Sequence, residues 1–131
     1  MAAHAETVNI LMEAVPDTTY IQQLLPEFEE ATGIDVNLEV VNYAEMHTKL
    51  VPQLVSNSGS YSAIVVDFYW VGEFFKAGWM QPLDDRIAAD GFDTSVYVPA
   101  MMDLVGQVEG TTYMLPFYNY AMGLLYRTDL L

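Results

Sequence analysis

Three strand-like runs, separated by helix-like stretches, lie in the first part of the chain and most constrain its fold. The run at 8–12 is apolar, the run at 35–41 alternates apolar and polar side chains, and the run at 62–67 is rich in β-branched residues. Each of these patterns predicts a strand. Strands and helices that alternate in this way predict an α/β fold, in which a mainly parallel sheet carries helices on both faces.

Helical periodicity fills the gaps between these strands. Apolar residues at helical spacing predict one helix at 20–28 and another at 43–54. Pro26 should kink the first helix or displace its start, because proline cannot donate the backbone hydrogen bond. Asn42 and Glu45, three residues apart, resemble a capping box at the start of the second helix.

The rest of the chain has weaker patterns. A short helix through two phenylalanines should end at Gly78, and the mixed residues 84–98 are typical of a loop. Proline at its first position favours a short helix at 99–105. Residues 107–115 are predicted to form a hairpin with Glu-Gly at the turn. Residues 117–126 are predicted to form an apolar extended segment.

The charge balance excludes several classes of ligand. The chain has 18 acidic and four basic residues, a net charge of −14. The basic residues are scattered along the sequence at Lys49, Lys76, Arg86 and Arg127. Nucleic-acid binding needs clustered cations, and anionic membranes would repel this chain. The charge therefore predicts no nucleic-acid partner and no polyanionic ligand, and it favours solubility.

Residues that could carry catalysis or hold a metal are few. Without cysteine the chain has no thiolate chemistry and no disulfide, and its two histidines, His4 and His47, stand far apart. No glycine-rich phosphate loop or nucleophile elbow occurs. Adjacent carboxylates such as Asp84 and Asp85 are typical of a solvated surface. We therefore expect no catalytic residue, no metal site and no cofactor.

The N-terminal residues show neither a basic start nor the apolar core of a signal peptide. A mature protein whose leader has been replaced by a start codon would begin in this way, and so would a cytosolic protein. No apolar run approaches the ~20 residues that span a bilayer.

Four stretches resemble the N-terminal portion of the family 1 extracellular solute-binding proteins, which include maltose-binding protein. They are LPEFEEATGIDV at 25–36, SAIVVD at 62–67 followed by FFKAGWMQPL at 74–83, VEGTTYMLP at 108–116, and GLLYRTDLL at 123–131. Each stretch alone is a weak signal, whereas four in the family's order are a strong one. The resemblance implies a type II periplasmic-binding-protein fold.

The resemblance also implies a domain division. Residues 1–116 would form most of an N-terminal lobe, and residues 117–131 would form the crossing between lobes and the first strand of a second lobe. Since the family's later return to the first lobe has no counterpart, a truncated chain or proteolytic fragment is expected. Half of a binding cleft should bind its ligand weakly or not at all.

The first candidate site residues directly follow a predicted strand. Ligands of parallel sheets bind beyond the carboxyl ends of the strands, and neutral sugars are held by aromatic faces and carboxylates. Asp67, Phe68, Tyr69 and Trp70 have this chemistry directly after a strand. The structural alternative is that Phe68 and Trp70 pack under the following helix.

Two further groups of candidates lie elsewhere in the chain. Tyr118, Asn119 and Tyr120 belong to the segment that supplies hinge residues of the cleft in the family, although tyrosine is also common in buried strands. Glu13 and Asp17 flank the first strand–helix loop, where acidic residues often serve only as caps or solvated charges.

The sequence predicts, from the resemblance, a non-catalytic protein that captures a small neutral carbohydrate or polyol for an ABC permease. Its location would be the periplasm or an extracytoplasmic membrane anchor. Two alternatives stay open: an α/β enzyme domain, which a turnover assay would reveal, and a self-associating fragment without ligand binding of its own. The exposed strand edges of an incomplete sheet favour such self-association.

Overall fold

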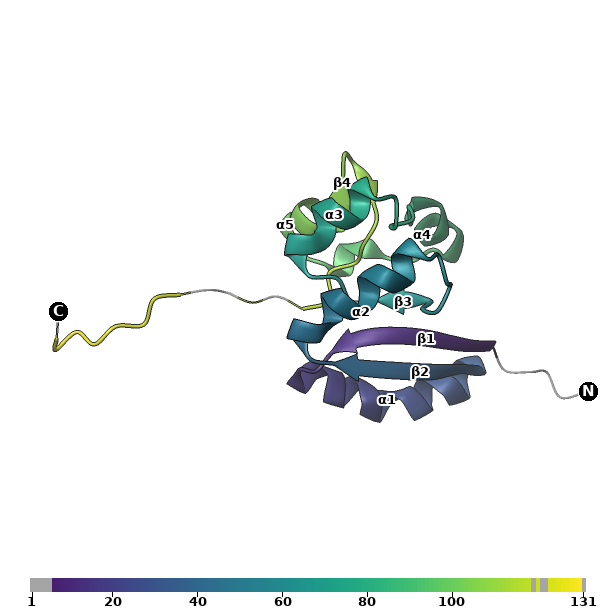
Figure 1. Cartoon of the computed structure of the whole chain (residues 1–131), viewed down its shortest axis with the longest axis horizontal. Coiled ribbons are helices and arrows are strands. Elements are labelled where there is room, and N and C mark those ends of the chain that lie inside the picture. Colours follow the sequence, from purple (N-terminus) through teal and green to yellow (C-terminus); the bar gives the residue numbers. More distant parts are fainter. Residues whose placement is uncertain (1–5, 119, 121–122, 131) are drawn as a thin grey trace, which may run out of the picture. The chain divides into compact units, whose positions relative to one another are not determined.

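The chain divides after Asp67 into two units, Met1–Asp67 and Phe68–Leu131. The structure, a computed structural model, describes residues 6–118, 120 and 123–130 (Figure 1). This division differs from the predicted one between a lobe ending at residue 116 and a crossing segment, which stays a prediction. In the described residues, no helix is long and apolar enough to cross a membrane.

Three parallel strands form the sheet of the first unit. β1 (Glu6–Glu13) lies in the middle, between β2 (Ile34–Val41) and β3 (Ala63–Ile64). β1 and β2 pair along their full length, from Glu6 opposite Ile34 to Glu13 opposite Val41. β3 is shorter than predicted, although the backbone amides on either side of it still donate to β1. The predicted parallel α/β sheet is confirmed.

Two helices connect these strands. α1 (Pro16–Thr32) links β1 to β2, and α2 (Tyr43–Val55) links β2 to β3 (Figure 1). The first connection leads from β1 to one neighbour and the second leads back past β1. Because such crossovers are right-handed in nearly all proteins, α1 and α2 cover opposite faces of the sheet.

Both helices tolerate an internal proline. α1 begins before the predicted helix and continues through Pro26, and α2 continues through Pro52. α1 ends at Gly33, whose φ of 72° is a left-handed conformation that suits glycine. The predicted capping box is wrong: Asn42 is the N-cap of α2, but its side chain makes no cap hydrogen bond.

The core of the first unit joins the central strand to α2. Leu11 of β1 and Met46 and Leu50 of α2 are almost completely buried. Met46 and Leu50 lie four residues apart, on one face of the helix. Glu39 of β2 forms an ion pair with Lys49 of α2. The side of the sheet that carries Leu11 and Glu39 therefore faces α2.

The turn from β1 into α1 is fastened by a buried hydroxyl. Thr18 is only 2% exposed, and its Oγ1 donates a hydrogen bond of 2.5 Å to the carbonyl oxygen of Glu13. The backbone amide of Ala14 donates across to Val41 at 2.8 Å. These bonds fix the chain at the carboxyl ends of β1 and β2.

The second unit consists of short elements. A 3-10 turn (Phe68–Trp70) precedes α3 (Val71–Lys76), and α4 (Asp84–Asp90) and a 3-10 turn (Thr94–Val96) follow. The prediction of a loop at 84–98 is therefore wrong. α4 has only seven residues, too few to show a helical period, although two aspartates in its first turn and a left-handed Gly91 support it.

A hairpin closes the second unit. α5 (Pro99–Met101) continues as a π-helical turn (Met102–Gly106), so the predicted helix at 99–105 exists but changes type. β4 (Gln107–Val108) then pairs antiparallel with β5 (Thr111–Thr112), as predicted. Among the described residues after β5 none lies in a strand.

Glu109 occupies a backbone conformation that disfavours its side chain. Glu109 and Gly110 join β4 to β5 with φ of 53° and 82°. Asparagine tolerates this left-handed region better, and Asn-Gly is a preferred two-residue hairpin turn. We expect Glu109→Asn to raise the free energy of unfolding by about 0.5–1 kcal/mol, measured by urea denaturation. Glu109→Gln removes the same charge without relieving the backbone, so an equal gain in both variants would contradict this.

Thr18→Val should weaken the first unit. The substitution keeps the shape of the side chain but leaves the bond to the Glu13 carbonyl unmade, so the free energy of unfolding should fall by roughly 1 kcal/mol. Amide exchange at residues 14–18 should accelerate. Thr19→Val is the matched control, because Thr19 is exposed in the same helical turn. Equal losses in the two variants would count against the bond.

Candidate ligand-binding site

Two acidic residues lie toward the carboxyl edge of the sheet in the first unit. Glu13 is the last residue of β1, and Leu11 pairs with Ile64 of β3. Counting along both strands from this pair places Glu13 level with Val66, one residue before Asp67. Because parallel strands end at the same edge of a sheet, Glu13 and Asp67 both lie toward this edge.

These acidic residues differ in exposure. Glu13 and Asp67 are half-buried, whereas Asp17 is exposed in the first turn of α1. The hydrogen bond from the Thr18 hydroxyl fixes the backbone carbonyl group of Glu13. The sequence shows threonines in this turn but not which one reaches back to the strand, so this positioning contact was missed.

Aromatic residues follow Asp67 in the chain, at the start of the second unit. Phe68 is 53% and Tyr69 81% exposed, and their rings meet edge to face with centroids 6.0 Å apart. Trp70 is half-buried and stacks on Phe74 at 6.3 Å. The structural alternative therefore holds for Trp70, whereas Phe68 and Tyr69 present aromatic surface to solvent.

The tyrosines near residue 120 form a small aromatic cluster in the second unit. Tyr118 contacts the ring of Phe117 at 5.0 Å and that of Tyr120 at 5.2 Å between centroids. Tyr118 is half-buried and Tyr120 is 66% exposed. Asn119, the third candidate of this group, lies outside the described residues.

A polar hollow of about 390 Å³ lies on the α2 side of the first unit. Its lining residues are Asn9, Asn37, Glu39, Gln53, Ser60 and Tyr61. Glu39 accepts from Tyr61 at 2.5 Å and pairs with Lys49, and these bonds lower the pKa of Glu39, with Lys49 the larger cause. Burial, followed by the bond to Glu39, raises the pKa of Tyr61 to about 12. Since these groups bond to one another, the cluster fastens α2 and the following loop to the sheet.

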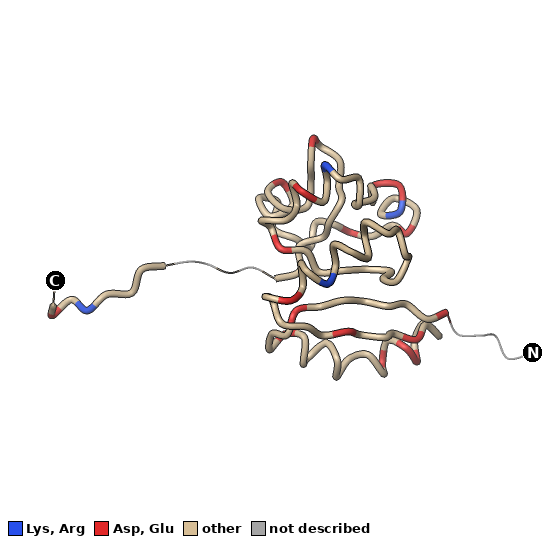
Figure 2. The backbone as a smooth tube through the Cα atoms, in the orientation of Figure 1, with Lys and Arg blue, Asp and Glu red and all other residues tan. Residues whose placement is uncertain are grey.

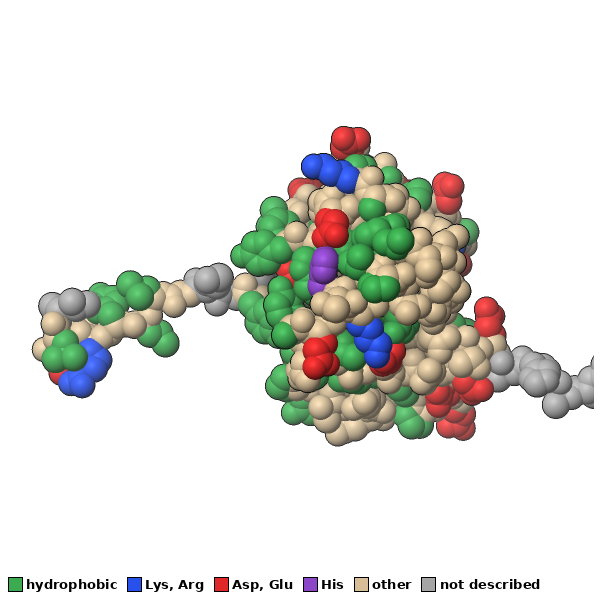
Figure 3. All heavy atoms as spheres, in the orientation of Figure 1, with side chains coloured by type: hydrophobic (Ala, Val, Ile, Leu, Met, Phe, Trp, Pro, Cys, Tyr) green, Lys and Arg blue, Asp and Glu red, His purple; other side chains and the backbone are tan. Residues whose placement is uncertain are grey.

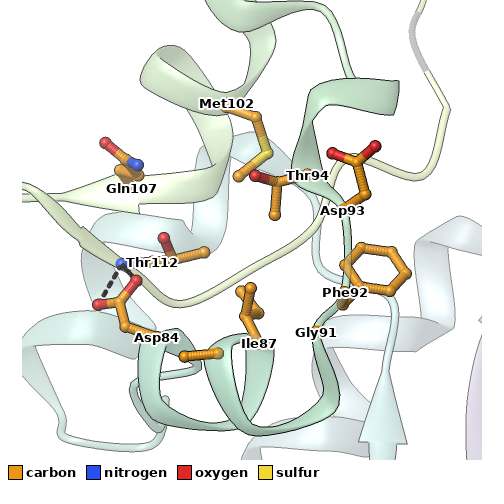
Figure 4. Close-up of a pocket in the computed structure, with 10 residues that line it drawn as sticks. Asp84, Ile87, Gly91, Phe92, Asp93, Thr94, Met102, Gln107 and Thr112 are labelled. Atoms are coloured by element: carbon orange, nitrogen blue, oxygen red, sulfur yellow. Dashed lines mark hydrogen bonds between the residues drawn. The ribbon is translucent and has the colours of Figure 1, made fainter.

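A larger hollow of about 620 Å³ lies in the second unit, between α4 and the β4–β5 hairpin (Figure 4). Both carboxylate oxygens of Asp84 accept from the backbone amide of Thr112, at 3.2 and 3.3 Å. Met102 lines the opposite side. Met102 lies so close to Gly106 that a Cβ added to this glycine would come within 3.3 Å of its sulfur. No local sequence pattern predicts this hollow, because its lining residues come from separate short elements.

Acidic side chains outnumber basic ones in both units (Figure 2). Among the described residues, no three histidine, aspartate or glutamate side chains group closely enough to hold a metal ion.

Comparisons with known proteins point in one direction. The family model of the bacterial extracellular solute-binding proteins matches residues 14–131. A curated relative, the erythritol/L-threitol-binding protein of Mycolicibacterium smegmatis, is 35% identical over 82 residues, which are 63% of this chain and 17% of that protein.

Solved structures agree in fold. An ABC transporter solute-binding protein from Agrobacterium radiobacter K84, in complex with ribitol, has a TM-score of 0.78 at 24% identity over 86% of this chain and 29% of its own. One from Agrobacterium vitis S4, with bound D-mannitol, has a TM-score of 0.71 at 25% identity over 82% of this chain and 26% of its own. The chain thus spans between 17% and 29% of the length of these three relatives. A match to the family model over nearly the whole chain shows that it belongs to the bacterial extracellular solute-binding proteins.

Proposed function

We propose that the chain supplies one wall of a cleft that captures a small polyol or neutral sugar for an ABC importer. One observation carries this proposal: the half-buried Glu13 and Asp67 share the carboxyl edge of the sheet, and Asp67 leads directly into the exposed rings of Phe68 and Tyr69. The family consists of binding proteins and not of enzymes, so the alternative of an α/β enzyme domain is set aside.

The chemistry of this edge fits polyhydroxylated ligands. Carboxylate oxygens accept hydrogen bonds from several hydroxyl groups, and aromatic faces cover the C–H surface of a sugar or polyol. An anionic ligand would meet repulsion from the carboxylates and from the net charge of −14. The ligands named for the three relatives, which are erythritol or L-threitol, ribitol and D-mannitol, support the polyol class.

The remaining predicted site residues enter the proposal in supporting roles. Asp17, Tyr118, Asn119 and Tyr120 would extend the wall, and Trp70 would support it from behind through its stack on Phe74. The ligand would be enclosed by a second lobe that residues 117–131 lead into, and closure would follow from tighter binding to the closed form. Such a protein would act outside the cytoplasm, in the periplasm or on a membrane anchor.

Titration with polyols followed by amide chemical shifts tests the wall directly. Ribitol and D-mannitol, added to the 131-residue chain up to ~100 mM, should shift the amides of residues 13–17 and 65–70. Because one wall leaves half of the ligand in water, the Kd should lie in the millimolar range. Asp67→Asn should raise the Kd by roughly three- to tenfold, since a charged acceptor is replaced by a neutral one.

Asp35→Asn is the matched control, since Asp35 lies near the opposite end of the sheet on β2. It should leave the titration unchanged. Shifts confined to other residues would place the site elsewhere, and a Kd below ~10 μM would show that one wall does not limit binding.

We also propose that the chain associates with itself through its C-terminal segment. Leu124, Leu125 and Tyr126 are 87%, 98% and 61% exposed, and Figure 3 shows apolar side chains along this segment. Burial at about 25 cal/mol per Å² favours pairing of such surfaces between copies. Light scattering from micromolar concentrations upwards should detect dimers, and Leu124→Ser with Leu125→Ser should abolish them.

Val96→Ser with Val98→Ser is the control for this experiment, because both valines are exposed outside the segment. A monomer at every concentration, with amides 123–130 protected from exchange, would mean that the segment folds onto its own chain.

A further inference from the structure

One flank of α1 exposes large apolar side chains that a surface helix would ordinarily bury. Tyr20, Leu24 and Phe28 are 67%, 59% and 44% exposed, and they follow one another at intervals of four residues. Because residues four apart lie on the same face of a helix, these three form one continuous stripe, which we call the α1 stripe. Contiguous exposed apolar surface marks interaction sites, whereas single apolar residues on a surface are ordinary.

The α1 stripe widens the apolar arc of the helix beyond what packing on the sheet requires. Ile21 and Leu25 lie on the side of α1 that faces the sheet and are half-buried. At about 100° per residue, the arc from Leu25 round to Tyr20 spans roughly 140°. A helix that packs on one core typically has an arc of roughly 100°. The opposite flank of α1 carries the polar residues Thr19, Gln22, Gln23 and Glu30. The helix therefore has apolar surface for a second neighbour on one flank only.

The α1 stripe overlooks a part of the sheet that α1 leaves uncovered. Glu29 bonds to the backbone amide of Val36 on the outer strand β2, so the polar flank of α1 lies toward that edge. The stripe, on the other flank, lies toward β1 and β3. On this side of the sheet α1 packs mainly against β2, and Val8 and Ile10 of β1 stay half-buried. Leu11, which faces α2, is fully buried. A second helix beside α1 would complete the unfinished layer.

The charges around the α1 stripe define the chemistry of its partner. Asp17 and Glu27 border the stripe and are exposed, and α1 carries no basic residue. The basic side chains that the structure describes in the first unit are His47 and Lys49, both on α2, which covers the other side of the sheet. A second copy of α1 would therefore bring like charges together. A partner with lysine or arginine beside its apolar face would be attracted instead.

We infer that the α1 stripe is a docking surface for a basic amphipathic helix of a partner protein. The partner helix lies beside α1, over β1 and β3, and its apolar residues cover Tyr20, Leu24 and Phe28. Its lysine or arginine residues pair with Asp17 and Glu27. Packed helices lie about 8–10 Å apart, which allows both sets of contacts. This inference does not depend on the ligand proposed above, although Asp17 belongs to both surfaces.

A synthetic peptide tests this surface on the complete 131-residue chain. The probe has about 18 residues, with leucines at helical spacing and lysines at the other positions. It should shift the amides of residues 17–32 and the methyl groups of Val8 and Ile10 in NMR spectra, with a Kd of roughly 10–100 μM. Two control peptides should bind at least about tenfold more weakly. One has the same residues in an order without helical spacing, and the other has glutamate in place of lysine.

Variants of α1 separate the stripe from the rest of the helix. Leu24→Ser interrupts the stripe and should raise the Kd roughly tenfold. Gln22→Ser is the matched control, because it introduces serine into the same turn on the polar flank and should bind like the unmodified chain. Glu27→Gln should raise the Kd about threefold and weaken its dependence on salt. Glu30→Gln removes the same charge from the polar flank and should change the Kd less.

Several outcomes would overturn the inference. Equal Kd values for Leu24→Ser and Gln22→Ser, or unchanged amides at residues 17–32, would show that the stripe is not the docking surface. Equal binding of the reordered peptide would show attraction by charge alone, and equal binding of the acidic peptide would contradict a basic partner. Shifts of amides 17–32 on dilution of the chain without peptide would identify a second copy as the occupant.

Discussion

The central position of β1 determines where the functional groups of the first unit meet. β1 pairs in parallel with β2 on one side and β3 on the other. Parallel pairing requires a crossover after each strand, so the chain turns at the same edge every time. Glu13 and Asp67 reach that edge for this reason, although more than fifty residues separate them in sequence. A slip of one residue in either pairing would turn these side chains to the other face of the sheet.

Polar groups elsewhere in the first unit serve this pairing. The carboxylate of Glu29, on α1, accepts a hydrogen bond of 2.8 Å from the backbone amide of Val36. This bond satisfies an N–H group of the outer strand β2. On the other side of the sheet, Glu39 joins Lys49 and Tyr61. An unprotected strand edge invites pairing with other chains. The acidic residues are therefore not all interchangeable surface charge, because some of them hold the sheet in the register on which the site depends.

Much of the first unit could be predicted from sequence because its elements are long enough to show a period. The alternation at 35–41 identifies β2, and Gly33 ends α1 as glycine in a left-handed conformation does. Predictions that depended on one side chain fared worse. Asn42 has the right type and spacing for a capping box, yet its side chain makes no cap bond. α4 was missed because seven residues give too little periodicity, and the hollow beside it depends on tertiary contacts that leave no local pattern.

The edge of the sheet alone can hold a neutral hydroxylated ligand only weakly. Water competes there with the charged acceptors and exposed rings for the ligand, so strong binding needs a second wall that removes the solvent. The affinity at this edge should therefore depend on closure of a second lobe over the ligand.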